Sequence, residues 1–156
     1  TIIIAHRITT LETLDKIIKD GDTVLDMGCG SGILAISSLL LGAKNAFGVD
    51  IDPLAVKTAK ENGLMNNFNE PELTFVCGDL DENVKGKYSV VVANIVADVI
   101  MMFAPNVRKY MAPDGVFIAS GIIDTRADEV ISCLESNGFT IVERYEQNGW
   151  NCLVMR

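Results

Sequence analysis

The most constraining feature of this sequence is a glycine-rich turn between a short strand and a helix. Residues 23–27 have the pattern of a buried strand, and the sequence DMGCGSG at 26–32 leads directly into a helical pattern at 31–41. Glycines at such a junction let the backbone turn sharply and let a ligand approach the main chain closely. The turn therefore predicts a ligand site at the end of this strand, with a tight turn that binds nothing as the alternative.

The spacing of the three glycines narrows the kind of ligand. Gly28, Gly30 and Gly32 follow the pattern Gly-x-Gly-x-Gly, and Ile33 stands where the dinucleotide-binding pattern Gly-x-Gly-x-x-Gly has its last glycine. No Gly-Lys-Ser or Gly-Lys-Thr of a P-loop follows the turn. Both departures argue against a site for a nicotinamide dinucleotide or for the phosphates of ATP.

Strand and helix patterns alternate along the rest of the chain. Further strands are predicted at 46–50, 73–77, 88–93 and 115–120, and further helices at 53–62, 97–110 and 124–137, with a turn at 113–115. The last two β runs, 139–146 and 150–155, are joined by Asn148-Gly149, a strong hairpin signal. This alternation predicts an α/β domain with a mostly parallel, seven-stranded sheet and helices on both faces. The closing hairpin is expected to add an antiparallel strand at the edge.

The composition limits the partners and the compartment. The 156 residues fit one domain, predicted to span 1–156, and the net charge of −8 argues against a broad basic face for nucleic acid or anionic lipid. The longest apolar runs are too short to cross a membrane, and the apolar start at 1–5 is too short for a signal peptide. Four widely spaced cysteines and a single histidine favour neither a metal site nor a disulfide framework, so we expect no metal and a reduced cytoplasm.

Acidic residues follow the second and third predicted strands. The carboxyl ends of parallel strands meet at one edge of a sheet, so Asp50 is placed to accept the hydroxyls of a ribose, with Ile51 against a purine face. Asp52 precedes Pro53 and is predicted to cap the next helix instead. Asp79 can accept a hydrogen bond from an exocyclic amine such as that of adenine, and a Gly-Asp turn is the alternative.

The fourth predicted strand is followed by an amide. The side-chain carbonyl of Asn94 and the backbone carbonyl of Ile95 can hold an amine N–H group and direct the nitrogen lone pair at an electrophile. The alternative is a capping Asn that opens the helix beginning at Ala97. Met101 and Met102 are predicted to line the core or the crevice. The sequence offers no nucleophile with a histidine partner and no paired carboxylates within one motif.

Taken together, these motifs resemble a known superfamily. The sequence VLDMGCGSG at 24–32 resembles motif I of class I S-adenosylmethionine-dependent methyltransferases, and GVDIDP at 48–53 resembles their second motif. Glutamine and adenine amino-methyltransferases carry Asn or Asp followed by Pro-Pro-Tyr or Pro-Pro-Phe after the fourth strand. The sequence NIVA at 94–97 is instead similar to the PrmA family, which methylates amino groups of a large-subunit ribosomal protein. Segments 120–123 and 149–153 are also similar to that family, and the resemblance covers nearly the whole chain.

The resemblance implies a Rossmann-like class I methyltransferase fold with S-adenosylmethionine as the cofactor. The three glycines would admit its methionine end, Asp26 would help to hold that end through the amino group or water, and the other acids would take the roles given above. The implied cofactor contacts are Asp26, Gly28, Gly30, Gly32, Asp50, Ile51, Asp79 and Asn94. Asn94 and the carbonyl of Ile95 are the implied catalytic groups, because they would orient the acceptor nitrogen.

Two departures from the family bear on the substrate. The family carries Gly-Thr-Gly-x-His-x-Thr-Thr before its first strand, whereas here the glycines are missing and His6 stands one residue farther from Thr9 and Thr10, so their roles are not transferred. The family also has a separate N-terminal domain that recognises the ribosomal protein. Residues 1–10 are interpreted as the remnant of an upstream segment, and a relative with another substrate is the alternative.

The expected activity is methylation of lysine or N-terminal amines of a large-subunit ribosomal protein. An acidic chain suits such a basic partner, and we expect neither direct nucleic-acid binding nor a membrane. Two alternatives remain at this point. One is an N-methyltransferase of the same fold acting on a small molecule or a nucleic acid, and the other is a cofactor-binding module without catalysis.

Overall fold

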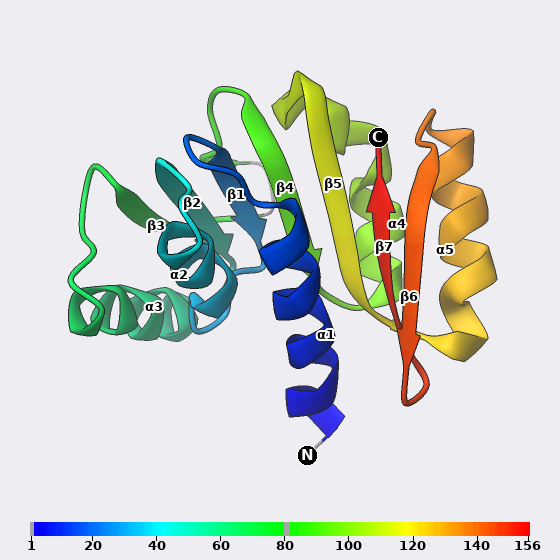
Figure 1. The fold of residues 1–156 in the computed structure, drawn as a ribbon, viewed down its shortest axis with the longest axis horizontal. Coiled ribbons are helices and arrows are strands. Elements are labelled where there is room, and N and C mark those ends of the chain that lie inside the picture. Colours follow the sequence, from blue (N-terminus) through cyan, green and yellow to red (C-terminus); the bar gives the residue numbers. More distant parts are fainter. Residues whose placement is uncertain (1, 80–81) are drawn as a thin grey trace.

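The structure is a computed structural model that describes residues 2–79 and 82–156, with side chains described from residue 9 onward. The side chain of His6, to which no role was transferred, lies outside this described part. Seven strands form one sheet in the order β3-β2-β1-β4-β5-β7-β6 (Figure 1). The strands are β1 (Thr23–Met27), β2 (Asn45–Asp50), β3 (Leu73–Cys77), β4 (Tyr88–Asn94), β5 (Met111–Ile123), β6 (Ile141–Gln147) and β7 (Trp150–Met155).

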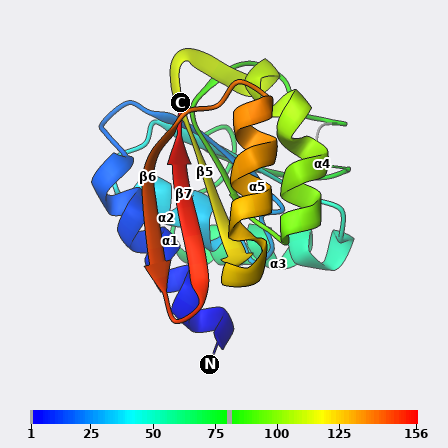
Figure 2. The ribbon, with the colours of Figure 1, turned by 90° about the vertical axis from the view of Figure 1, so that its right-hand side faces the viewer.

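The helices cover both faces of this sheet, as predicted. They are α1 (Ile2–Ile17), α2 (Ile33–Leu40), α3 (Pro53–Met65), α4 (Ala97–Val107) and α5 (Asp124–Ser136). Figure 2 shows α4 and α5 on one side of the sheet and α1 and α2 on the other. The chain builds outward from β1 through β2 to β3, then returns to pair β4 with the free edge of β1. A crevice is expected at the carboxyl ends of β1 and β4, where the strand order reverses.

The two central strands separate two hydrophobic layers. Leu25 and Val91 belong to the layer under α4 and α5, whereas their neighbours Val24 and Val92 belong to the layer under α2 and α3. Successive side chains of a strand point to opposite faces, so strands buried on both faces must be apolar throughout. This requirement explains why these strands were recognisable as mostly apolar runs, with Asp26 as the buried acid within β1.

The predicted hairpin is confirmed, but its antiparallel strand is not at the edge. Asn148 and Gly149 have φ values of 52° and 81°, as a two-residue turn of type I′ requires. The antiparallel strand β7 pairs with β5 on one side and with β6 on the other. All but its first residue are buried, whereas β6 has no buried residue, so the apolar strand occupies the interior and the polar strand the edge.

Two other expectations about the chain path were wrong. The predicted helix over 97–110 ends at Val107 and continues only as a 3₁₀ turn at Arg108–Tyr110. The segment 113–115, predicted as a turn before β5, lies inside that strand. Tyr88 pairs with Met111 but Val90 pairs with Val116, so the intervening residues form a bulge.

Helix α1 was not predicted, because its buried side is not a simple apolar stripe. Thr9, Thr10 and Thr13 are buried with Leu14, and they are satisfied by hydrogen bonds such as that from the Thr13 hydroxyl to the Thr9 carbonyl. Buried hydroxyls of this kind depend on partners from distant strands, which periodicity alone does not reveal. Within the described residues, none of the helices combines the length and the apolar character that crossing a membrane requires.

Candidate functional site

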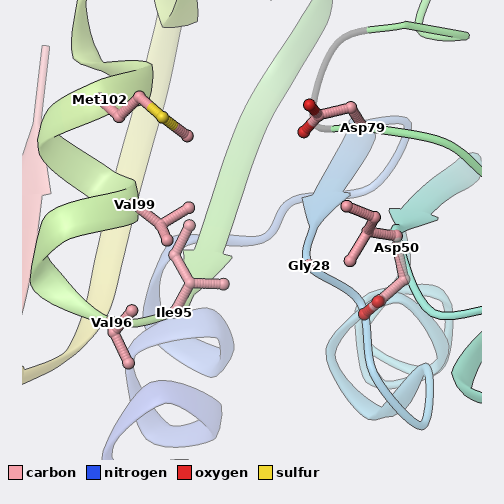
Figure 3. A pocket seen from close by; sticks show the side chains of 8 residues that line it. Gly28, Asp50, Asp79, Ile95, Val96, Val99 and Met102 are labelled. Atoms are coloured by element: carbon pink, nitrogen blue, oxygen red, sulfur yellow. The ribbon is translucent and has the colours of Figure 1, made fainter.

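A cavity of about 550 Å³ opens at the carboxyl ends of the central strands, where the switch in strand order predicted a crevice. One wall comes from the tips of β1 and β2 and the residues after β3, and the other from the end of β4 and the first turns of α4 (Figure 3). The lining residues are Gly28, Asp50, Ile51, Asp79, Ile95, Val96, Val99 and Met102. The volume and the mixture of apolar side chains with a few polar groups are typical of small-molecule sites.

The glycine turn shapes the cavity at one point and the core at another. Gly28, Gly30 and Gly32 have φ values of 68°, 53° and 81°, in the region that favours glycine. A Cβ on Gly28 would lie 2.5 Å from Cγ2 of Ile95, so the absence of a side chain lets the two walls meet. A Cβ on Gly32 would lie 2.7 Å from Cζ of Phe75, within the layer under α2 and α3. Of the three predicted glycines, only Gly28 lines the cavity.

The Asp50 carboxylate is fixed by the backbone around it. Its Oδ2 accepts a hydrogen bond of 2.8 Å from the Gly30 N–H, and its Oδ1 accepts one of 2.9 Å from the Asp52 N–H. Each carboxylate oxygen can accept more than one hydrogen bond, so both retain capacity for a ligand hydroxyl. Asp52 itself accepts from the Leu54 N–H and caps α3, with Pro53 in the first helical position, which confirms the predicted cap.

Ile51 and Asp79 complete the wall formed by the strand tips. Ile51 is 72% exposed although it is a large apolar side chain, because it borders the open cavity. The backbone of Asp79 makes a turn in which its carbonyl accepts from the Glu82 N–H, while its carboxyl lines the cavity. Figure 3 shows this carboxyl across the cavity from Met102. The turn interpretation and the ligand interpretation of Asp79 are therefore compatible.

Asn94 ends β4 and does not cap the following helix. The N-cap of α4 is Val96, and no side chain caps that end. Within the described part of the chain, Oδ1 of Asn94 is buried without a hydrogen-bond partner. A Cβ on Gly121 would lie 2.8 Å from this oxygen and 3.1 Å from the Ile95 carbonyl oxygen, so β5 supports both predicted carbonyls closely. Unpaired buried acceptors are costly, and Asn94 itself is not among the residues that line the cavity.

Asp26 lies behind the cavity and does not line it. The side chain is 1% exposed, and its Oδ2 accepts a hydrogen bond of 3.2 Å from the Ala35 N–H in the first turn of α2. Its Oδ1 has no partner among the described residues. Burial raises the pKa of Asp26 to about 7, the Ala35 N–H opposes that rise, and the negative charge of Asp50 adds to it.

On the apolar wall, the sequence analysis anticipated Ile95 and Met102 but missed Val96 and Val99. Val96, Val99 and Met102 recur at intervals of three, a spacing that places side chains on one face of a helix. This recurrence was the available signal, but it does not distinguish a cavity wall from a core-facing stripe. Nearby, Thr10 donates a hydrogen bond of 2.6 Å to Ser120, which pairs with Asn94 in register. Helix α1 is therefore anchored to the strand beside the site.

The electrostatic character of the cavity favours a ligand with donors and positive charge. Asp50 and Asp79 are the ionisable residues among the described residues of its lining, and the rest of that lining is largely aliphatic. Among the described residues, no group of three or more histidine, cysteine, aspartate or glutamate side chains is arranged to hold a metal ion. Fixed acceptors beside an apolar slot fit a nucleoside whose sugar hydroxyls and base amine act as donors.

Known proteins resemble this chain over nearly its whole length. A family model described as ribosomal protein L11 methyltransferase (PrmA) matches residues 5–156. Ribosomal protein L11 methyltransferase of Clostridium perfringens is 45% identical over 146 residues, which cover 94% of this chain and 46% of that relative. The chain thus spans about half the length of the curated relatives it matches.

Solved structures share the fold. Ribosomal protein L11 methylase from Lactobacillus delbrueckii subsp. bulgaricus matches with a TM-score of 0.90 and 30% identity, over 97% of this chain and 79% of that chain. An RNA methyltransferase from Salinibacter ruber, in complex with S-adenosyl-L-homocysteine, matches with a TM-score of 0.73 and 18% identity, over 94% and 88% of the two chains. The predicted Rossmann-like class I methyltransferase fold is confirmed.

Proposed function

This chain belongs to the ribosomal protein L11 methyltransferase family. On that premise we propose that its cavity binds S-adenosylmethionine and that the protein transfers the methyl group to an amine of a ribosomal protein. One observation carries the proposal: the Asp50 carboxylate, held by two backbone N–H groups, lies beside an apolar slot in the cavity where the strand order of the sheet reverses.

The proposed cofactor contacts follow from the lining. Asp50 accepts the ribose hydroxyls, Ile51 and Val99 flank the purine, and Asp79 accepts from its exocyclic amine. The methionine end is proposed to lie along the backbone at Gly28, which lines the cavity. The bound sulfonium makes the methyl group electrophilic, and the protein supplies proximity and alignment.

The proposed role of the second wall is to orient and desolvate the acceptor. Oδ1 of Asn94 and the carbonyl of Ile95 accept hydrogen bonds from the amine and direct its lone pair toward the methyl group. A lysine amine has a solution pKa of about 10.4 and must lose its proton before it attacks. Apolar neighbours such as Val96 disfavour the charged ammonium, and the proton leaves to solvent.

The proposed acceptor is a lysine or N-terminal amine of a large-subunit ribosomal protein. The names of the relatives and the net charge of −8 support this choice, because ribosomal proteins that bind RNA are basic. A cytoplasmic reaction belongs to the same proposal, since all four cysteines lie in the described part of the chain and are free.

Transfer of a radiolabelled methyl group to separated large-subunit proteins and RNA tests this function. We expect label in protein and none in RNA. Asn94→Ala should bind S-adenosylmethionine with unchanged affinity but lose about 100-fold in turnover, since it removes an acceptor used only by the amine. Calorimetry measures the affinity and label incorporation measures the turnover.

The alternative outcomes are separable. Label in RNA would identify a nucleic-acid methyltransferase, and cofactor binding without transfer to any ribosomal fraction would identify a binding module. Unchanged turnover in Asn94→Ala would remove the amine-orienting role from that side chain. An absence of heat on titration with S-adenosylmethionine would overturn the proposed function altogether.

A further inference from the structure

Asp26 is a buried acid beside the cleft whose charge no nearby cation balances in the described structure. It lies two residues before Gly28, which lines the cavity, and it is 1% exposed. Its single hydrogen bond comes from the Ala35 N–H, and its Oδ1 has no partner among the described residues. An anion with one long hydrogen bond is poorly stabilised in a buried place, so a proton is the simplest partner for the second oxygen.

Among the residues whose side chains the structure describes, the elements packed around Asp26 offer no compensating positive charge. Gly48 of β2 and Val92 of β4 lie opposite it in the sheet register, and helix α2 contains no charged residue. The charged group that acts on it is the Asp50 carboxylate, which repels a second negative charge.

The remaining titratable neighbour is the Cys29 thiol. Burial raises its pKa well above the ordinary value, and the negative charges of Asp26 and Asp50 raise it further. Cys29 therefore stays neutral near pH 7 and adds no charge. The same balance of burial, the Ala35 N–H and the negative charge of Asp50 raises the pKa of Asp26 to about 7, so Asp26 is about half protonated near neutrality.

We propose that Asp26 holds a proton in the free site and releases it to solvent when a cationic ligand enters, so that the site favours a sulfonium over a neutral thioether. The inference rests on the proposed function, because the sulfonium is that of S-adenosylmethionine and the thioether is that of S-adenosylhomocysteine. A nearby positive charge favours the ionised carboxylate. The ammonium of the amino-acid end is common to both ligands, and the sulfonium is the charge that distinguishes them. One proton passes to the buffer for each Asp26 that ionises, and no covalent bond changes.

The coupling of proton release to ligand binding makes the affinity for S-adenosylmethionine increase with pH. Binding that expels a proton strengthens as the pH rises, and the two effects are reciprocal. If the cation lowers the pKa of Asp26 from about 7 to about 5, the Kd for S-adenosylmethionine falls about tenfold between pH 6 and pH 8. The Kd for S-adenosylhomocysteine should change by less than about threefold. Both ligands carry the same amino-acid end, so its titration cancels in the comparison.

Calorimetry in buffers of different ionisation enthalpy counts the protons released on binding. For the wild type at pH 7 we expect about 0.5 proton released with S-adenosylmethionine and markedly less with S-adenosylhomocysteine, because Asp26 is half protonated there. Asp26→Asn should bind S-adenosylmethionine with no proton release from this position. Asp52→Asn is the matched control, since it neutralises an exposed acid at the same edge and retains a helix-capping side chain, and it should release protons as the wild type does.

The outcomes separate this inference from the proposed function. Binding of S-adenosylmethionine with equal proton release in the wild type and Asp26→Asn overturns the inference and leaves the function intact. If Asp26→Asn does not bind S-adenosylmethionine, the comparison of the two ligands in the wild type tests the inference, because equal proton release with both ligands also overturns the inference. Failure of the wild type to bind S-adenosylmethionine at any pH overturns the proposed function instead.

Discussion

The two walls of the cleft are built on different principles. At the strand tips, the Asp50 carboxylate is held by two backbone N–H groups, and Gly28 has the positive φ that its turn requires. On the α4 side, Val96 and Met102 are 63% and 65% exposed, and their side chains are free of such constraints. The first wall is preorganised for polar groups, whereas the second offers an adaptable apolar surface. Substitutions should therefore affect cofactor affinity far more at the first wall than at the second.

Gly28→Ala should give the largest effect on affinity. The added Cβ would lie 2.5 Å from Ile95 at a φ of 68°, which pushes the two walls apart. We expect the Kd for S-adenosylmethionine to rise about 100-fold, equivalent to about 2.7 kcal/mol. Gly86→Ala is the matched control, because Gly86 has a φ of 89° and a Cβ there would meet no atom within 4 Å. Equal affinity changes in the two variants, measured by calorimetry, would attribute the effect to general backbone strain.

Asp50→Asn should weaken cofactor binding by about 30-fold, or about 2 kcal/mol. The amide has one oxygen, so it cannot accept from both Gly30 and Asp52 while also accepting from two hydroxyls. Asp52→Asn, which retains its capping geometry, should change the Kd by less than threefold. Titration calorimetry of both variants measures the contrast, and similar losses in the two would argue against a specific role for Asp50.

Asp26→Asn should stabilise the ligand-free protein at high pH. In the folded chain the pKa of Asp26 is about 7, and in the unfolded chain it is near 3.8, so the native carboxyl binds the extra proton. In the wild type, the contribution of this carboxyl to the free energy of unfolding is fully present below pH 3.8 and is lost as the pH rises through 7. The variant escapes that loss, and its Tm should exceed that of the wild type by on the order of 5 °C at pH 8 and by less at pH 5. A Tm difference independent of pH would mean that Asp26 is ionised throughout this range.

Met102→Ala should have the smallest effect. The side chain is largely exposed in the cavity wall, so its loss removes limited apolar contact and should raise the Kd for S-adenosylmethionine about threefold. Leu64→Ala, at a side chain 61% exposed on α3 and absent from the cavity lining, should leave the Kd unchanged. A loss of affinity above 30-fold in Met102→Ala would show that the α4 wall contributes as much to cofactor binding as the strand tips do.

The contrast between the walls also explains which site residues the sequence could predict. Gly28, Asp50 and the Asp52 cap depend on local backbone chemistry, in which residue type and spacing carry the signal. The position of Asn94 was predictable because it ends an apolar run, but its unpaired Oδ1 depends on how β5 packs beside it. The state of Asp26 depends on complete burial, which no local pattern reveals.

The elements of the fold also divide into those that local sequence patterns predicted and those that depend on distant contacts. The alternation of strands and helices predicted the layers and the parallel sheet, because each element carries its own periodicity. Helix α1 escaped prediction because Thr9 and Thr10 are buried through partners in the distant β5 and β6. The interior position of β7 required a comparison of two strands, since only the contrast between buried β7 and exposed β6 assigns the edge.

The place of β7 has a consequence for synthesis on the ribosome. Strand β5, which carries Ser120 and Gly121 beside Asn94, keeps an unpaired edge until residues 150–155 have emerged and folded back. An open edge of buried character is a template for pairing with another nascent chain. The tight Asn148-Gly149 turn shortens the time for which this edge is exposed, because β6 and β7 can pair locally as a hairpin and then dock on β5 as one unit.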